Sequence, residues 1–145
     1  MPETIGMGRV VVPAVVESIQ DLWDVERGTL TDESVRRIQI EEAFVDAGAT
    51  TLCLPTRYIE KLGLRQFGER MSMTSVGPRR ARIFGPVRLT VQGRDCNVDV
   101  LEIDDAASVL IGQVPLELLD FVVDPPGRRL IGNPAHGGEQ MLEVY

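Results

Sequence analysis

The sequence is poor in cysteine and histidine. Its 145 residues include two cysteines and one histidine. Cys53 and Cys96 form no Cys-x-x-Cys pair, which argues against zinc or redox chemistry, and we expect both to be small buried residues. A Ser-His or Cys-His mechanism would have to use His136. That residue lies in a glycine-rich stretch, and we expect it to be a solvated tail residue rather than a catalyst.

Positive charge and long apolar runs are also in short supply. The chain has 15 lysines and arginines against 22 acidic residues, a formal net charge of −7. Such a chain is not expected to bind nucleic acid, which needs a basic face, or an anionic membrane surface. No apolar run is long enough to span a bilayer, and residues 1–4 lack the basic start of a secretory signal. We therefore expect a cytoplasmic protein.

Short apolar runs separated by glycine and proline fill most of the chain. The sequence has 14 glycines and 9 prolines, a spacing typical of a mainly β protein. A length of 145 residues is enough for one domain with its own core, and no repeat or linker divides the chain. We expect a single domain over residues 1–145, with a core over about residues 10–131 and a tail over residues 132–145.

The apolar pattern predicts the following elements. Strands are expected at residues 10–16, 35–40, 51–54, 109–111, 121–124, 129–131 and 141–145, and short helices at residues 55–62 and 115–120. Pro13 cannot donate to a strand ladder, so the first strand is either an edge strand or carries a bulge. The polar stretch over residues 21–31 contains Gly28 and is expected to be a loop or a short outer hairpin.

Two hairpins are predicted in the middle of the chain. The second joins residues 87–91 to residues 96–101 through a turn at residues 92–95, with clean alternation on one buried face. The first joins residues 70–75 to residues 80–84. Its tip is formed by Val76, Gly77, Pro78 and Arg79.

One aspartate follows the apolar end of the second expected strand. Asp46 is succeeded by Ala47 and Gly48, within the stretch from Phe44 to Thr50. An aspartate in such a position either caps its own backbone in a turn or is half of a catalytic pair. The chain offers one such site, so a catalytic pair would need a second copy of the chain.

The order of these features resembles the retropepsin-like, retroviral-type aspartic proteases in a bacterial single-domain form. The family signature is an Asp-Thr/Ser-Gly-Ala turn after an apolar strand, and residues 45–50 match it. A second element places two apolar residues and a glycine before a helix, and Leu110, Ile111 and Gly112 match it ahead of residues 113–120. The resemblance covers about residues 10–131. It implies a mainly β, closed-barrel acid protease fold with one or two short helices, working as a homodimer.

The resemblance also implies roles for these residues. Asp46 of each copy would meet at a two-fold axis, where one carboxylate activates water and the other, protonated, donates to the peptide carbonyl. Residues 110–112 would support the turn, the tip at residues 76–79 would close as a flap over an extended peptide or protein substrate, and residues 141–145 are our candidate dimer-interface strand. No metal or organic cofactor is implied. The active-site turn itself consists of Asp46, Ala47, Gly48, Ala49 and Thr50.

Ala47 departs from the family pattern. The family usually has Thr or Ser there, and its hydroxyl forms a hydrogen bond across the dimer that braces the two turns. The loss of a neutral hydrogen bond costs about 0.5–1.5 kcal/mol, and symmetry doubles it. Two alternatives follow: a catalytically weak or inactive dimeric binding or scaffold module that kept this fold, and a monomeric small-molecule binder.

Overall fold

The computed structural model describes residues 10–124, 126 and 128–144. The strands are β1 (Val10–Ser18), β2 (Arg37–Val45), β3 (Leu52–Pro55), β4 (Gln66–Thr74), β5 (Gly77–Val91), β6 (Arg94–Ile103), β7 (Leu110–Ile111), β8 (Phe121–Asp124) and β9 (Arg129–Gly132). The α-helices are α2 (Ile19–Glu26), α3 (Thr56–Leu62) and α4 (Gln113–Leu119), and the 3-10 turns are η1 (Asp32–Ser34) and η2 (Pro134–His136). The protein is therefore mainly β, as the sequence predicted.

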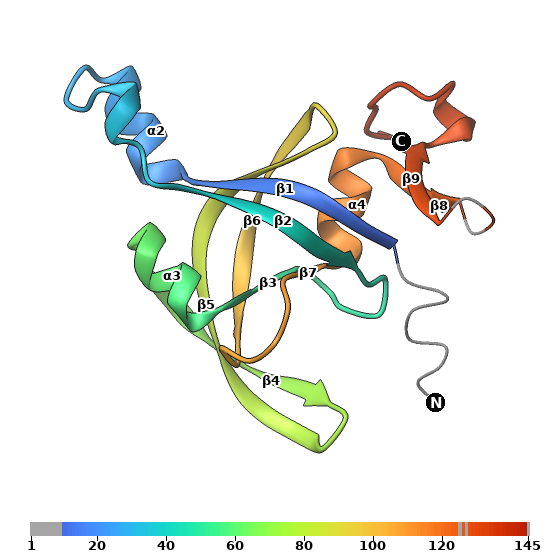
Figure 1. Cartoon of the computed structure of the whole chain (residues 1–145), viewed down its shortest axis with the longest axis horizontal. Helices are drawn as coiled ribbons and strands as arrows, with labels where there is room; N and C mark the ends of the chain where they lie inside the picture. Colours follow the sequence, from blue (N-terminus) through green and yellow to red (C-terminus); the bar gives the residue numbers. More distant parts are fainter. Residues whose placement is uncertain (1–9, 125, 127, 145) are drawn as a thin grey trace.

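Seven strands form one sheet, in the order β1-β2-β7-β3-β6-β5-β4 (Figure 1). A further antiparallel pairing joins β1 to β5, so the successive pairings lead from β5 back to β1 and leave β4 outside this circuit. The strands β8 and β9 form a separate hairpin beside α4. The two-residue strand β7 lies between β2 and β3, where it is parallel to β2 and antiparallel to β3.

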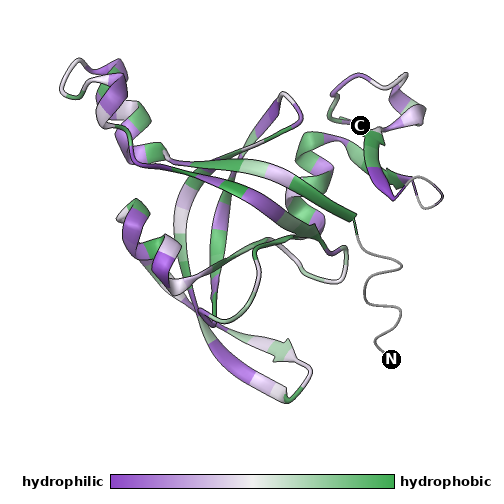
Figure 2. Cartoon of the chain, viewed as in Figure 1, coloured by the Kyte–Doolittle hydropathy of each residue, from purple (hydrophilic) through white to green (hydrophobic). Residues whose placement is uncertain are grey.

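The apolar core comes from strands with one buried face. Burial alternates along β1, from Val10 to Val16, as the two-residue period of a strand requires. The core continues through β2, β3, β5 and β6 and is covered by apolar residues of α3 and α4, among them Leu62 and Leu119, which are fully buried. Figure 2 shows these apolar residues along the strands and on α4. Cys53 and Cys96 are buried free thiols, as predicted.

Pro13 lies at an interruption of the β1–β2 ladder. The register of β1 against β2 shifts between Val12 and Ala14, so Pro13 falls where the ladder is irregular and needs no N–H. The same strand pairs with β5 only from Val15 to Ser18, so β2 is its one partner strand at Pro13. Both features that the sequence offered as alternatives, an edge and a bulge, therefore apply at this residue.

The prediction of a loop or hairpin over residues 21–31 is wrong for residues 21–26, which belong to α2, and is correct for residues 27–31, which form a loop. The side chain of Ser18 caps this helix by accepting the N–H of Asp21. Asp21 is buried, and its carboxylate accepts hydrogen bonds from the backbone N–H, Nε and Nη2 of Arg36 at 2.8, 2.8 and 2.9 Å. The described chain therefore has three α-helices, where one or two were expected.

The two predicted hairpins are present. Val91 pairs with Arg94, which leaves Gln92 and Gly93, both with positive φ, as the two-residue turn of the β5–β6 hairpin. In the β4–β5 hairpin, Thr74 pairs with Gly77, so the tip is shorter than predicted and residues 77–79 all belong to β5.

The β4–β5 hairpin extends beyond the rest of the sheet (Figure 1). Both of its strands have a register irregularity at its base, between Gln66 and Gly68 in β4 and between Phe84 and Val87 in β5. Because Gln66 pairs with Phe84, the two irregularities lie at the same level. Interruptions of this kind bend a strand and increase its local twist.

The predicted last strand at residues 141–145 is wrong for residues 141–144, which are irregular; Tyr145 lies outside the described residues. This segment takes its contacts from α4 and from side chains, which a strand pattern cannot reveal. Among the described residues, no helix is long and apolar enough to cross a membrane.

Replacing Asp21 with Asn is expected to destabilise the fold by roughly 1.5–3 kcal/mol near neutral pH, the range for hydrogen bonds to charged groups. The pKa of Asp21 is lowered from its ordinary 3.8, chiefly by hydrogen bonds from the Arg36 side chain. The stabilisation is therefore present above that value and is lost as the pH falls through the lower folded pKa. Urea unfolding of both proteins at neutral and strongly acidic pH measures this difference.

Asp24→Asn on the same helix is the matched control. Asp24 forms an i,i+3 ion pair with the largely exposed Arg27, so its loss should change stability by about 0.5 kcal/mol or less. Equal unfolding midpoints for the two variants at neutral pH would contradict the anchoring role of Asp21.

Candidate active site

Asp46 is the first residue after β2, and β7 fixes its backbone. Phe44 and Val45 pair with Leu110 and Ile111 in parallel register. The N–H of Asp46 donates to the carbonyl oxygen of Ile111 at 2.9 Å, which continues the ladder one residue beyond the strand. The residue carrying the candidate carboxylate is thus held by a buried strand.

The turn after Asp46 closes on the aspartate itself. Its Oδ1 accepts the N–H of Gly48 at 2.9 Å, and its backbone carbonyl accepts the N–H of Ala49 at 3.0 Å. The side chain is half-buried, and its other oxygen has no hydrogen-bond partner among the described residues. This geometry satisfies the turn-capping interpretation and at the same time leaves one carboxylate oxygen available for chemistry.

The loop after Asp46 also caps α4. The N–H groups of Gly112, Gln113 and Val114 donate to the carbonyl oxygens of Thr51, Ala49 and Thr50 at 3.1, 2.8 and 2.8 Å. The first N–H groups of a helix have no partner within the helix, and Gly112 has no side chain to cap them. The loop carbonyls therefore cap the N-terminus of α4, and the same hydrogen bonds hold the loop in place.

Gly112 is required by this close approach. A Cβ at this position would lie 2.5 Å from the carbonyl oxygens of both Ala49 and Thr51, which are backbone atoms. The structure thus brings together both sequence elements singled out above, residues 46–50 and residues 110–112.

Ala47 is exposed at the outer side of the turn, beside a groove of about 800 Å³. The groove is lined further by α4, by β8 and by the tail, whose Met141, Leu142 and Val144 are 49%, 66% and 89% exposed. Ala47 offers no hydroxyl to this surface, so the turn is held by backbone hydrogen bonds.

The hairpin tip lies apart from the Asp46 turn. Among the described residues, no hydrogen bond or ion pair joins residues 76–79 to residues 46–50. Val76 is 70% exposed, and Met71 and Met73 on the same hairpin are 62% and 78% exposed. An ion pair of 3.3 Å between Arg80 and Glu69 joins the two strands. The hairpin is thus an open arm with uncovered apolar side chains.

The Cys53 thiol lies close enough to Asp46 for the carboxylate charge to affect its pKa. Burial, and after it the charge of Asp46, raises the pKa of the Cys53 thiol to about 11. Burial likewise raises the pKa of Cys96 to about 11. Both thiols therefore stay protonated at neutral pH, and neither is a nucleophile. Among the described residues, no cluster of three or more His, Cys, Asp or Glu side chains is suited to a metal.

His136 is not the solvated tail residue that the sequence predicted. Its side chain is 13% exposed and lies between two carboxylates, with Nδ1 at 2.6 Å from Asp120 and Nε2 at 3.0 Å from Glu143. Asp120 is buried, in the left-handed conformation that ends α4. These three residues were missed because they are separated in sequence and no local periodicity relates them.

Gly112→Ala is expected to destabilise the protein by about 1–3 kcal/mol, the usual range for overpacking, because backbone oxygens cannot move away from the added methyl. Chemical denaturation measures the loss. Gly68→Ala is the matched control, since a Cβ there meets nothing within 4 Å and Gly68 has no positive φ. A stability loss that is the same in both variants would contradict the close approach at Gly112.

No family model and no curated protein matches the sequence. Among solved structures, the chain is similar to the solution structure of the simian foamy virus (mac) protease. The two share 20% sequence identity over 75% of this chain and 93% of the viral chain, with a TM-score of 0.47.

Proposed function

We propose that the chain is an aspartic endopeptidase of the retropepsin type. The observation that carries this proposal is the Asp46 turn, which presents one free carboxylate oxygen from a backbone fixed on both sides. The carbonyl oxygen of Ile111 accepts the N–H of Asp46, and the N–H groups at the start of α4 donate to the carbonyl oxygens of residues 49–51. Acid–base catalysis needs its reacting group to be held in this way, because small displacements of that group lower the reaction rate.

The proposed chemistry uses two copies of Asp46. Two adjacent carboxylates share one proton, because both cannot ionise cheaply side by side. The ionised one takes a proton from water, whose oxygen attacks the carbonyl carbon of the peptide, while the protonated one donates to the carbonyl oxygen. The C–N bond then breaks as a proton passes to the leaving nitrogen. The hydrogen bond from Gly48 fixes Oδ1 and so orients the reacting oxygen.

The second carboxylate comes, in this proposal, from a second copy across a two-fold axis. In this proposal each copy forms a closed barrel, which the circuit of pairings from β1 to β5 supports, and the Asp46 turn lies at its margin. The exposure of Ala47 and Gly48 supports this arrangement, because the turns must approach each other closely. The apolar groove beside Ala47 and the exposed tail residues supply further surface for a partner.

The β4–β5 hairpin is the proposed flap. An extended peptide lying between the flap and the Asp46 turns would pair with backbone and cover apolar side chains. Met71, Met73 and Val76 are exposed and suited to such contacts. Substrates with apolar side chains near the cleaved bond are therefore favoured.

A non-catalytic dimeric scaffold is the second candidate function. The observation that favours it is Ala47, because a module without catalysis does not need the bracing hydroxyl between the two turns. The two functions differ in what Asp46 does: the scaffold needs only its turn, which the hydrogen bond to Gly48 provides, whereas the protease needs its proton chemistry.

Asp46→Asn is expected to reduce cleavage of a fluorogenic peptide library by at least about 10²-fold between acid and neutral pH, the lower end of general acid–base contributions. The amide keeps an oxygen for the Gly48 N–H, so the turn survives. Asp104→Asn is the matched control: Asp104 accepts the N–H of Ala106 at 2.8 Å in the same two-residue pattern and lies in a different loop. Equal cleavage by the wild type and Asp46→Asn would exclude the protease proposal.

Ala47→Thr is expected to strengthen the dimer by about 1–3 kcal/mol, since two hydroxyl hydrogen bonds are added by symmetry. That corresponds to about 5- to 150-fold in the dissociation constant, measured by sedimentation equilibrium. Ala47→Val has nearly the same shape without the hydroxyl and is the control. An equal gain in dimer affinity for both variants would show that the larger side chain strengthens the dimer by its volume and not by a hydrogen bond. A wild-type chain that stays monomeric at high concentration and cleaves nothing would favour the small-molecule binder.

A further inference from the structure

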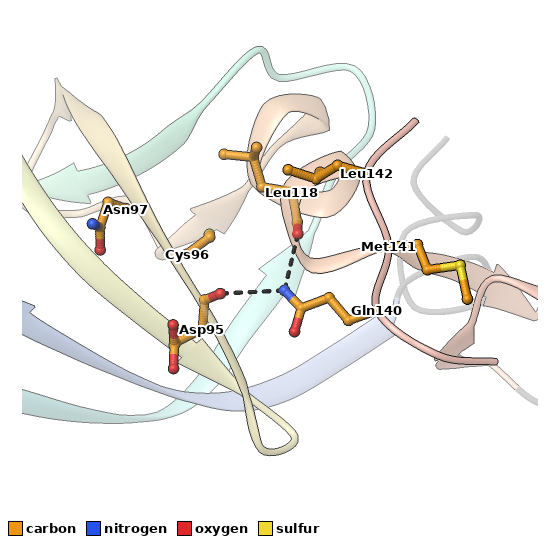
Figure 3. A pocket seen from close by; sticks show the side chains of 7 residues that line it. All are labelled: Asp95, Cys96, Asn97, Leu118, Gln140, Met141 and Leu142. Carbon is orange, nitrogen blue, oxygen red and sulfur yellow. Dashed lines mark hydrogen bonds between the residues drawn. The ribbon is translucent and has the colours of Figure 1, made fainter. Parts of the chain in front are cut away.

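The end of the chain is fastened by a cluster of side chains that the proposed catalysis does not use. We call residues 140–144 the strap. The N–H of Met141 donates to Oδ2 of Asp120 at 3.0 Å. The side-chain nitrogen of Gln140 donates to the carbonyl oxygens of Leu118 and Asp95 at 3.0 and 3.3 Å, so the strap lies against α4 and the start of β6 (Figure 3).

His136 joins the strap to the buried end of α4. Its Nδ1 lies 2.6 Å from Asp120 Oδ2, and its Nε2 lies 3.0 Å from Glu143 Oε2 in the strap. Asp120 is further oriented by the side chain of Asn133, which donates to Oδ1 at 3.2 Å. One imidazole thus spans two carboxylates from segments 23 positions apart in the sequence.

The arrangement requires both ring nitrogens to carry a proton. An ionised carboxylate only accepts hydrogen bonds, and a neutral imidazole has a single N–H. The imidazolium form donates to both Asp120 and Glu143, whereas the neutral form leaves a lone pair facing one of them. Loss of this proton therefore removes one of the two hydrogen bonds that link Asp120, His136 and Glu143.

The strap borders the groove beside the Asp46 turn. Met141, Leu142 and Glu143 line this groove of about 800 Å³ on one side, and Ala47 lines it as well. Met141 and Leu142 also line a neighbouring cavity of about 380 Å³ under the strap (Figure 3). Movement of the strap would therefore change both cavities, including the surface next to Ala47.

We propose that His136 is a pH-sensitive latch, which in its imidazolium form holds the strap against the groove beside the Asp46 turn and in its neutral form releases it. The charged groups that face the ring are Asp120, at the end of α4, and Glu143, in the strap. Arg94, from β6, donates to the carbonyl oxygens of Leu119, Asp120 and Gly138.

The sign of the pH dependence follows from the two partners. Hydrogen bonds with Glu143 and with Asp120 raise the pKa of His136 above its ordinary 6.5. The stabilisation is therefore complete below 6.5 and is lost as the pH rises through the higher value of the closed state. At the acid end, the hydrogen bond from His136 lowers the pKa of Asp120 below its ordinary 3.8.

The latch itself is independent of catalysis, and its effect on peptide cleavage rests on the proposed function. In that setting, an open strap frees the groove and the exposed apolar residues Leu142 and Val144 for a second copy. Dimer formation would then be favoured as the pH rises through the raised pKa of His136, because the latch opens there.

His136 is the only histidine, so its proton resonance in an NMR titration is unambiguous. In the wild-type chain we expect a midpoint above 6.5 and, over the same pH range, a fall in the hydrogen-exchange protection of the Met141 amide after correction for intrinsic exchange. For each unit by which the His136 pKa in the closed state exceeds 6.5, we expect the protection of the Met141 amide to fall about tenfold when the strap is released. A constant protection while His136 titrates would overturn the proposal.

Glu143→Gln removes one of the two charges and leaves an amide oxygen of the same shape. We expect its His136 midpoint to lie below that of the wild type, with a smaller change in Met141 protection. Glu139→Gln is the matched control, since it makes the same charge change in the same segment, at a side chain that faces no ring nitrogen of His136. Identical midpoints in wild type and Glu143→Gln would also overturn the latch. Neither readout uses peptide cleavage, so failure of the protease proposal leaves this test intact.

Discussion

The exchange of backbone hydrogen bonds between the Asp46 loop and the start of α4 is the constraint on which the site depends. Each partner has polar groups that it cannot satisfy alone: the loop has outward carbonyls, and the helix has unpaired N–H groups at residues 112–114. Their pairing joins β2, β7 and α4 into one rigid unit. A Cβ at position 112 would clash with two carbonyl oxygens of the loop, so this unit can form only because residue 112 is a glycine. The position of the Asp46 carboxylate therefore depends on Gly112, which has no reactive group of its own.

Local patterns were sufficient for most of the fold. The apolar pattern identified most of the strands, the helix predicted at residues 55–62 is α3, and the stretch at residues 92–95 contained the turn of the second hairpin. The failures share one cause, which is that the decisive partner is distant in sequence. The buried Asp21 stabilises α2 through Arg36, 15 residues away, and no local pattern reports that pair. His136 is buried by Asp120 and Glu143 for the same reason.

The candidate site was predictable as a set of residues but not as a functioning site. The family resemblance implied that residues 110–112 support the Asp46 turn, and the structure places these two segments in contact. The proposed second carboxylate would come from another copy of the chain, so the pattern within one chain cannot position it. In the described residues, the turn is bordered instead by a groove and an irregular tail.

The strand β5 has a mechanical consequence for the protruding hairpin. This single strand of 15 residues pairs with β4 along the hairpin and with β6 and β1 within the body of the sheet. The two ladder irregularities lie at the base of the hairpin, where the regular hydrogen bonding of both strands is interrupted. A bend at residues 84–87 would therefore displace the tip of the hairpin without breaking the pairing of β5 with β1, which begins at Val87.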